Sequence, residues 1–409
     1  MAQETAQSLR IGMLLDIYKP YVSGVTNYVA LHKRALEALG HKVFIFTFGG
    51  GAYDDEELYV IRSPGLPFNV KATGLQVSYR YSRQAQLKLR TMDVLHAHHP
   101  FVSGPLALRY GEPRGIPVAF TNHTRYDLYA QHYLPAFIPD GFASTILQNY
   151  LPNFCQRCDL VVAPSRGIAQ VMKDLGVTRE ITVIPNGVDL SPFQNARPGR
   201  TRAEAGLPAD AVVLMYLGRL GPEKNITFLM RAFAGVAAAC PAAVLALVGD
   251  GPEADNLRDQ AEKAGVASQV RFFGPVDYAA VPEYLKLADV FVTASQSEGH
   301  PLSLIEAMAS GLPAVGIDSP GVSDTIEDGV NGLLSTPDLA VFTAKLVRLV
   351  MDGETRHRLA EGARVSAQQY DINRTVALLL DQYVHLVTQG AHRRRGLAGA
   401  LQRLRKRLA

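Results

Sequence analysis

The chain has 409 residues, more than one ordinary hydrophobic core holds, so two domains of about 200 residues each are expected. Hydrophobic residues make up 47% of the sequence and charged residues 19%, a composition that excludes a disordered chain. The formal net charge of +3 is too small to indicate a polyanionic partner by itself.

The cysteines and the apolar runs exclude several further classes of protein. Three cysteines are too few for a disulfide framework. Cys155 and Cys158 form a lone C-x-x-C pair without the further ligands of a structural zinc site, and we interpret them as reduced thiols of a cytoplasmic protein. No apolar run reaches the roughly 18 residues of a membrane span, and the first ten residues lack the apolar core of a signal peptide. Peripheral contact with a membrane stays open.

The first half of the chain repeats a strand–helix pattern. Residues 10–15 form a short apolar run, residues 25–39 have helical spacing, and a second apolar run follows at 43–48. Further strands are expected at residues 94–97, 118–121, 160–163 and 181–184. Continuous runs of Val, Ile and Leu that alternate with helices predict a parallel sheet covered on both faces.

The same pattern restarts in the second half, after a Pro-, Asn- and Gly-containing linker at residues 191–208. Strands are expected at residues 212–218, 244–248, 270–273, 290–293 and 314–317. The predicted fold is α/β, with two Rossmann-like, doubly wound parallel-sheet domains that face a central cleft. We assign residues 1–195 to the N-terminal domain, 196–372 to the C-terminal domain, 373–390 to a helix that crosses back to the N-terminal domain, and 391–409 to a basic tail.

The most informative stretch is SEGHPLSLIEAMAS at residues 297–310, directly after the expected strand at 290–293. A helix is expected to begin near Leu302, where the backbone N–H groups of Leu302 and Ser303 have no partner within the helix. These N–H groups and the helix dipole favour an anion, so a diphosphate would fit at this helix tip.

Two acidic residues in this stretch are candidate ligand-binding groups. Glu306, in the helix, would accept hydrogen bonds from ribose hydroxyls, as acidic residues do in dinucleotide sites. Glu298, in the loop before the helix, would hold a sugar hydroxyl. Taken alone, the two glutamates also fit an ordinary surface loop and helix face.

A second stretch, YLGRLGPEKN at residues 216–225, places Arg219 and Lys224 on a strand-to-helix turn. Arg as a planar fork and Lys as a mobile point charge both suit a diphosphate. The alternative is a solvated basic turn with Glu223 as the partner. The Gly-rich turn VGDGP at residues 248–252 is a weaker signal of the same kind.

In the first half, Gly24 in the sequence Ser-Gly-Val begins a helix soon after the first strand and would let the backbone approach a phosphate or a sugar. His96, His98 and His99 follow one strand, and His123 follows another. Because alternate strand residues point to opposite faces and no acidic residue has ligand spacing to these histidines, a structural or substrate-contacting role is favoured over a metal site.

No D-x-D stands at a strand end, so the phosphate charge would be neutralised by Arg219, Lys224 and a helix tip, with no metal and no cofactor.

Together these stretches resemble glycosyltransferase family 4, whose members have the GT-B fold. The resemblance rests on Ser-Gly-Val at 23–25, IPNGVD at 184–189, GRLGPEKN at 218–225, and Glu298 with Glu306 in an E-x7-E pattern. It covers residues 10–387, and the combination is far more specific than any single motif.

The resemblance implies a retaining hexosyltransferase that needs no metal and uses a nucleotide diphosphate sugar, with UDP-glucose as the expected donor. Arg219 and Lys224 would bind the donor diphosphate and stabilise the leaving group, and Gly24 would lie against a donor phosphate. Leu302 and Ser303 would complete the phosphate site.

The resemblance also assigns residues around the sugar. Glu306 would hold the ribose, Glu298 would contact the transferred sugar, and His123 would sit beside its reacting face. Attack would occur from the front face, with a donor phosphate oxygen receiving the acceptor's proton. Two departures, Ser23 in place of the first Gly of a Gly-Gly pair and His300 in place of an aromatic residue, leave the donor sugar preference open.

The acceptor is expected to be a membrane lipid. Residues 123–133 resemble the acceptor-side loop of bacterial transferases that glucosylate diacylglycerol, and His98 and Tyr126 are assigned to the acceptor side.

Residues 58–92 contain no Asp or Glu but six Lys or Arg residues, interleaved with Tyr79 and Tyr81. The tail at 391–409 is basic, with Leu397, Leu401, Leu404 and Leu408 on one helical stripe. Both segments would bind an anionic membrane, on the inner face of the cell membrane.

Several alternatives stay open at this point. The tail also fits a solvated or disordered terminus, and nucleic acid is disfavoured because no aromatic platform accompanies it. The same chemistry fits a soluble sugar, sugar phosphate or small alcohol as the acceptor. A nucleotide-sugar-binding protein without transfer, or a nucleotide-sugar epimerase, fits the fold but not the combined set of site residues.

Overall fold

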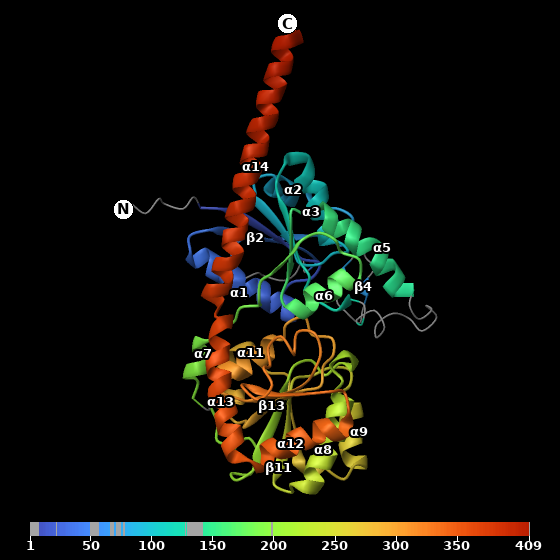
Figure 1. Cartoon of the computed structure of the whole chain (residues 1–409), viewed down its shortest axis with the longest axis vertical. Coiled ribbons are helices and arrows are strands. Elements are labelled where there is room, and N and C mark those ends of the chain that lie inside the picture. The colour runs from blue at the N-terminus through green and yellow to red at the C-terminus, as the bar shows by residue number, and fades with distance from the viewer. Residues whose placement is uncertain are drawn as a thin grey trace.

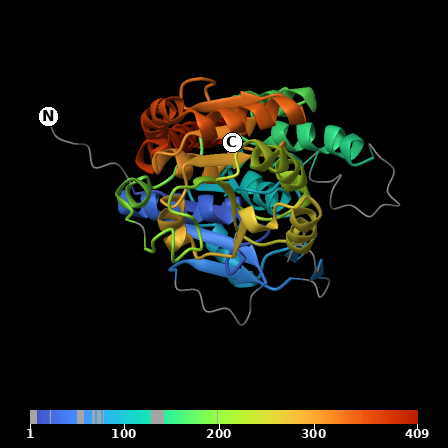
Figure 2. The same ribbon diagram turned by 90° about the horizontal axis from the view of Figure 1, so that it is seen from below.

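The computed structural model describes residues 8–21, 23–49, 57–65, 69–70, 75–76, 78–126, 128, 142–197 and 199–408, with residues 391–408 as backbone only. Two α/β domains follow one another along the longest axis of the molecule (Figure 1). Seen from below, helices lie on both sides of the strands (Figure 2). The expected GT-B architecture of two parallel-sheet domains is confirmed.

The N-terminal domain is built on a seven-stranded parallel sheet with the order β3-β2-β1-β6-β7-β8-β9. Its strands are β1 (Arg10–Leu14), β2 (Lys42–Phe48), β3 (Val60–Ser63), β6 (Val94–Ala97), β7 (Val118–Thr121), β8 (Leu160–Ala163) and β9 (Ile181–Val183). Its helices are α1 (Gly24–Ala38), α2 (Arg83–Leu89), α3 (Ser103–Gly111), α5 (Phe142–Arg157) and α6 (Arg166–Asp174). Two short strands, β4 (Asn69–Val70) and β5 (Leu75–Gln76), pair with each other outside this sheet.

The C-terminal domain contains a six-stranded parallel sheet with the order β12-β11-β10-β13-β14-β15. Its strands are β10 (Val212–Leu217), β11 (Ala243–Val248), β12 (Val270–Gly274), β13 (Val290–Thr293), β14 (Ala314–Ile317) and β15 (Gly332–Ser335). Its helices are α8 (Ile226–Ala239), α9 (Ala254–Lys263), α10 (Val281–Leu285), α11 (Leu302–Ala309), α12 (Leu339–Met351) and α13 (Gly353–Ala367).

Each sheet buries one hydrophobic cluster on each face. In the N-terminal sheet, Leu14 and Phe44 point to one cluster while Met13 and Val43 point to the other. In the C-terminal sheet the same alternation divides the residues of β10 between two clusters. Strands buried on both faces need apolar residues at successive positions, which is why they read as continuous Val, Ile and Leu runs.

A long helix, α14 (Ile372–Leu408), begins at the junction of the domains, runs along the N-terminal domain and extends past it (Figure 1). Ile372, Val376, Leu379, Tyr383 and Leu386 recur at intervals of four and three residues and join the cluster beneath α1. None of the described helices is long and apolar enough to cross a membrane.

The structure differs from the sequence expectations at three places. The edge strands β3 and β15 were not expected, because each is short and stands apart from the repeating strand–helix pattern. The expected linker contains a one-turn helix, α7 (Ser191–Asn195), whose Phe193 is buried in the C-terminal core. Tyr81, which we expected on a membrane-facing surface, is buried against Phe46 and Phe48, so only Tyr79 of that pair is exposed.

Candidate active site at the domain junction

The turn that carries Arg219 and Lys224 follows the end of β10, as expected. It is held by the Gly-rich turn after β11, since Leu220 N–H donates to the Asp250 carbonyl at 2.9 Å. A Cβ added at Gly249 would lie 1.9 Å from the Gly218 carbonyl oxygen, so the two turns pack this closely only because residue 249 is glycine. The Gly-rich turn at residues 248–252, which was the weaker sequence signal, therefore supports the turn that carries Arg219 and Lys224.

Lys224 and Glu298 form an ion pair with 2.7 Å between Nζ and Oε1, although they are far apart in the sequence. The Ser297 hydroxyl also donates to the Glu223 carbonyl at 2.9 Å, which joins the two loops. Burial lowers the pKa of Lys224, but the charge of Glu298 and the hydrogen bond to it outweigh burial and hold this pKa above its ordinary value. The structure thus brings the two expected loops into direct contact.

Arg219 lies on the same turn, with its guanidinium 3.7 Å from the buried carboxylate of Glu223. The pairing with Glu223 that the sequence offered as an alternative to phosphate binding is therefore present in the ligand-free chain. It does not remove Arg219 from the site, because its side chain is still 32% exposed.

The helix expected near Leu302 is α11, and it begins at that residue. Pro301 is the N-cap, and no side chain of the described residues caps the helix, so the first backbone N–H groups keep their capacity to bind an anion. Leu302 is buried, whereas Ser303 is partly exposed.

Glu306 lies one turn into α11 and is 4% exposed. The Tyr278 hydroxyl donates to its Oε1 at 2.9 Å. Burial raises the pKa of Glu306 to about 7, and the hydrogen bond from Tyr278 opposes this shift only in part. Tyr278 was not found from the sequence, because it stands in an unremarkable turn after β12.

On the N-terminal side, Gly24 is the first residue of α1 and Ser23 is the N-cap. Ser23 and Thr26 form a capping box, which fixes the direction in which the helix begins. Apart from its chain neighbours and its own helix backbone, no heavy atom of the described residues lies within 4 Å of a Cβ added at Gly24.

His123 follows β7, and its backbone carbonyl lies against Gly299 of the opposite domain. A Cβ added at Gly299 would lie 2.4 Å from the His123 carbonyl oxygen. The Ser165 hydroxyl donates to the Gly299 carbonyl at 2.9 Å, which fixes this contact between the domains. The backbone of His123 therefore lies against the loop that carries Glu298.

Two further hydrogen-bonded pairs join the domains beside His123. The Asn186 side chain donates to the His300 carbonyl at 2.9 Å, and the Asn186 backbone N–H donates to His300 Nδ1 at 3.2 Å. Gly167 N–H donates to the Asp324 carboxylate at 2.9 Å. Asn186 belongs to the IPNGVD motif, which the sequence marked without assigning a role to this residue.

The acceptor-side residues are described only in part. The His98 ring is buried and hydrogen-bonds His123, with 3.0 Å between His98 Nδ1 and His123 Nε2. Tyr126 packs edge-to-face on Phe101. Residue 127 and the stretch 129–133, which completes the expected acceptor loop, lie outside the described residues. Among the described residues, no three His, Cys, Asp or Glu side chains are grouped to hold a metal ion.

Comparison with known proteins identifies the family of the chain. Residues 22–192 match the model of Glycosyltransferase Family 4, and residues 199–366 match the model of Glycosyl transferases group 1. An alpha-monoglucosyldiacylglycerol synthase of Acholeplasma laidlawii is 30% identical over 377 residues, which are 88% of this chain and 93% of that protein. The chain belongs to glycosyltransferase family 4.

Other members of this glycosyltransferase family have similar degrees of identity. An alpha-monoglucosyldiacylglycerol synthase of Streptococcus pneumoniae is 29% identical, over 88% of this chain and 83% of that protein. A D-inositol 3-phosphate glycosyltransferase of Frankia alni is 28% identical, over 90% of this chain and 96% of that protein.

Among solved structures, Anabaena HepE in complex with UDP has a TM-score of 0.74 and 21% identity, covering 91% of this glycosyltransferase and all of that chain. A sucrose-phosphate synthase from Thermosynechococcus elongatus has a TM-score of 0.76 and 21% identity, covering 93% and 100%. At this identity the comparison establishes the fold.

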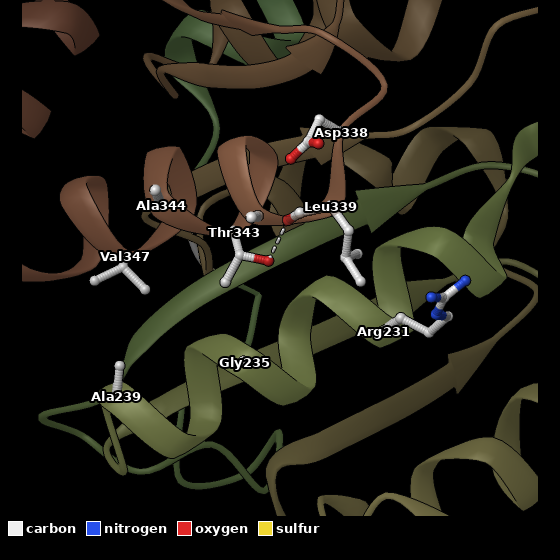
Figure 3. Close-up of a pocket in the computed structure, with 9 residues that line it drawn as sticks. Arg231, Gly235, Ala239, Asp338, Leu339, Thr343, Ala344 and Val347 are labelled. Carbon is white, nitrogen blue, oxygen red and sulfur yellow. Dashed lines mark hydrogen bonds between the residues drawn. The ribbon is translucent and has the colours of Figure 1, made fainter.

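A groove on the glycosyltransferase lies away from this junction, between α8 and α12 (Figure 3). Most of its walls are small or apolar residues, with Arg231 and Asp338 as the charged exceptions, and the Thr343 hydroxyl donates to the Leu339 carbonyl at 2.7 Å. None of the expected site residues lines this groove, so we place the active site at the domain junction.

Proposed function

We propose that the protein transfers glucose from UDP-glucose to a membrane lipid such as diacylglycerol, with retention of configuration and without a metal ion. The observation that carries the proposal is the ion pair between Lys224 and Glu298, because Glu298 lies in the loop whose Gly299 contacts the carbonyl of His123. This arrangement offers cations for a leaving diphosphate beside groups that can hold a sugar.

In this proposal the donor diphosphate lies between Arg219, Lys224 and the uncapped tip of α11. Arg219 and Lys224 neutralise the charge that develops as the bond from the sugar's anomeric carbon to the diphosphate breaks. Gly24 leaves room for a donor phosphate at the start of α1. No divalent ion is needed, because two cations and helix N–H groups supply the positive field.

The sugar and the ribose are held by carboxylates on the same side. Glu306 accepts hydrogen bonds from the ribose hydroxyls, and Glu298 accepts one from the transferred sugar. The acceptor hydroxyl attacks from the face that the diphosphate leaves, and its proton passes to a donor phosphate oxygen. This route needs no pair of catalytic carboxylates such as glycosidases use.

The choice of a lipid acceptor is supported by the similarity to the alpha-monoglucosyldiacylglycerol synthases and by a basic surface. Arg80, Arg83 and Arg90 are exposed, and Tyr79 beside them is 60% exposed. Exposed cations of this kind attract the anionic inner face of a cell membrane, where each contributes about 1 kcal/mol. We extend this peripheral contact to the basic tail at 391–409, whose side chains lie outside the described residues.

The test is release of UDP from UDP-glucose in the presence of vesicles that contain diacylglycerol and an anionic phospholipid. We expect release with these vesicles, in the presence of a chelator, and a product with retained anomeric configuration. Removal of residues 391–409 is expected to weaken vesicle binding without abolishing turnover on detergent-dispersed lipid. No release with any lipid, or loss of activity with chelator, would contradict the proposal.

A soluble acceptor is the second candidate, because D-inositol 3-phosphate glycosyltransferases match this chain at 28–31% identity. The same assay distinguishes the two. Release of UDP with an inositol phosphate or a free sugar, and none with vesicles, would favour the soluble acceptor while leaving the donor site unchanged.

A further inference from the structure

Behind His123 lies a cluster of buried rings that the transfer reaction does not yet use. We define the histidine cluster as Tyr28, His32, His96, His98 and Tyr383, all at most 2% exposed. Tyr28 stacks on His32 with 3.7 Å between ring centroids, and His96 lies 4.3 Å from His98. The cluster joins α1, the strand β6 with the loop after it, and the helix α14.

One member of this cluster contacts His123 through a hydrogen bond. Nδ1 of His98 is 3.0 Å from Nε2 of His123, and the two rings are stacked at 5.2 Å. Burial lowers the pKa of both rings well below the ordinary value, and neighbouring histidines lower it further, so both are neutral near pH 7. In a neutral imidazole one nitrogen donates and the other accepts, so one ring donates to the other.

The other nitrogen of His98 decides which ring donates. Nε2 of His98 is buried and has no hydrogen-bond partner among the residues that the structure describes. His96 is not the missing partner, since Thr121 and Tyr383 bond its two nitrogens. A proton on Nε2 of His98 would be a buried donor without an acceptor, at a cost of about 1–3 kcal/mol. A bare lone pair is tolerated better than an orphaned N–H.

We infer that His98 is a positioning residue that donates from Nδ1 and thereby fixes His123 as the tautomer protonated on Nδ1. Within the described part of the chain, Nδ1 of His123 has no partner, so its N–H is available to a ligand. His123 then acts as a hydrogen-bond donor to an oxygen of the transferred sugar. His123 does not act as a general base through Nε2, because the lone pair on Nε2 already accepts the hydrogen bond from His98.

This inference rests on the proposed function for its ligand but not for its geometry. We therefore test it first by ¹⁵N NMR of histidine-labelled protein, with His123→Asn to assign the signals. We expect Nδ1 of His123 to be protonated and Nε2 to be unprotonated in the ligand-free protein. A proton on Nε2 of His123 would overturn the inference, and this result does not depend on whether the enzyme uses glucose or a lipid.

The second test measures turnover in a matched set of variants. His98→Leu removes the donor, and His98→Asn keeps an N–H near the same position. We expect kcat to fall about tenfold in His98→Leu with little change in KM for the donor, and to recover in His98→Asn. His32→Leu, which disturbs the same cluster without touching His123, is expected to keep its kcat. Equal kcat in His98→Leu and the unmodified protein would overturn the inference, and if His98→Leu does not fold, the protonation of His123 measured by ¹⁵N NMR decides.

Discussion

On the C-terminal side of the junction the polar groups are charged and paired, whereas on the N-terminal side they are neutral rings. Lys224 keeps its charge because Glu298 lies 2.7 Å away, and both side chains retain some access to solvent. Within the described ranges, His98 and His123 have no acidic partner in hydrogen-bond contact, and burial holds both rings neutral. In the proposed function, one domain would therefore supply the electrostatic field and the other the orientation of the sugar.

The largest effect is expected from removing a cation on the C-terminal side of the junction. Lys224→Ala is expected to lower kcat by about 100- to 1000-fold, because it removes a preorganised positive charge from the leaving diphosphate. The measurement is UDP release at saturating donor, with thermal unfolding to show that the fold persists. Lys263→Ala, an exposed lysine at the end of α9, is the control and is expected to be unaffected. An unchanged kcat in Lys224→Ala would show that the phosphate site is misassigned.

A smaller effect is expected at the buried carboxylate. Glu306→Gln is expected to weaken UDP binding by about ten- to hundredfold, because a charge-assisted hydrogen bond to the ribose becomes a neutral one. In the unmodified protein the affinity is expected to fall as the pH is lowered through about 7, where Glu306 becomes protonated. Calorimetric titration with UDP between pH 6 and 8 measures both effects, with the exposed Glu262→Gln as the control.

The raised pKa of Glu306 also predicts how the stability of the protein depends on pH. Folding raises the pKa of Glu306 from 4.5 to about 7, so the folded state binds this proton more tightly than the unfolded state does. The resulting stabilisation is fully present below pH 4.5 and is lost as the pH rises through 7, on the order of 3 kcal/mol. The free energy of unfolding of Glu306→Gln, measured with denaturant between pH 4.5 and about 7, is expected not to show this loss. An identical pH profile in both proteins would contradict the buried, raised-pKa carboxylate.

The smallest effect is expected on the N-terminal side, from a change that adds one methyl group. The added methyl group of Gly24→Ala meets no non-neighbouring heavy atom of the described residues within 4 Å, so the fold is expected to tolerate it. Donor affinity is expected to fall about tenfold because the phosphate is displaced. Gly353→Ala is a close control, since Gly353 is also the first residue of a helix and has only Arg356 nearby, at 3.7 Å. Equal donor affinity in Gly24→Ala and the unmodified protein would remove Gly24 from the phosphate site.

Much of the fold could be predicted because parallel strands buried on both faces leave an unmistakable pattern. The strands at 118–121, 160–163, 290–293 and 314–317 lie where the apolar runs place them. The edge strands β3 and β15 and the buried position of Tyr81 escaped prediction, because edge pairing and burial depend on neighbours from other segments. The roles assigned to the site residues, including the absence of a metal, stay predictions.

The sequence by itself determined the fold class, the family and the residue types at the ends of the strands, because these depend on local spacing along the chain. Only the tertiary structure decided that Lys224 meets Glu298, that Tyr278 meets Glu306, and that the carbonyl of His123 rests against Gly299. It also decided that His98 lies behind His123. The physical reason is that each of these contacts joins segments that only packing brings within hydrogen-bond or van der Waals distance.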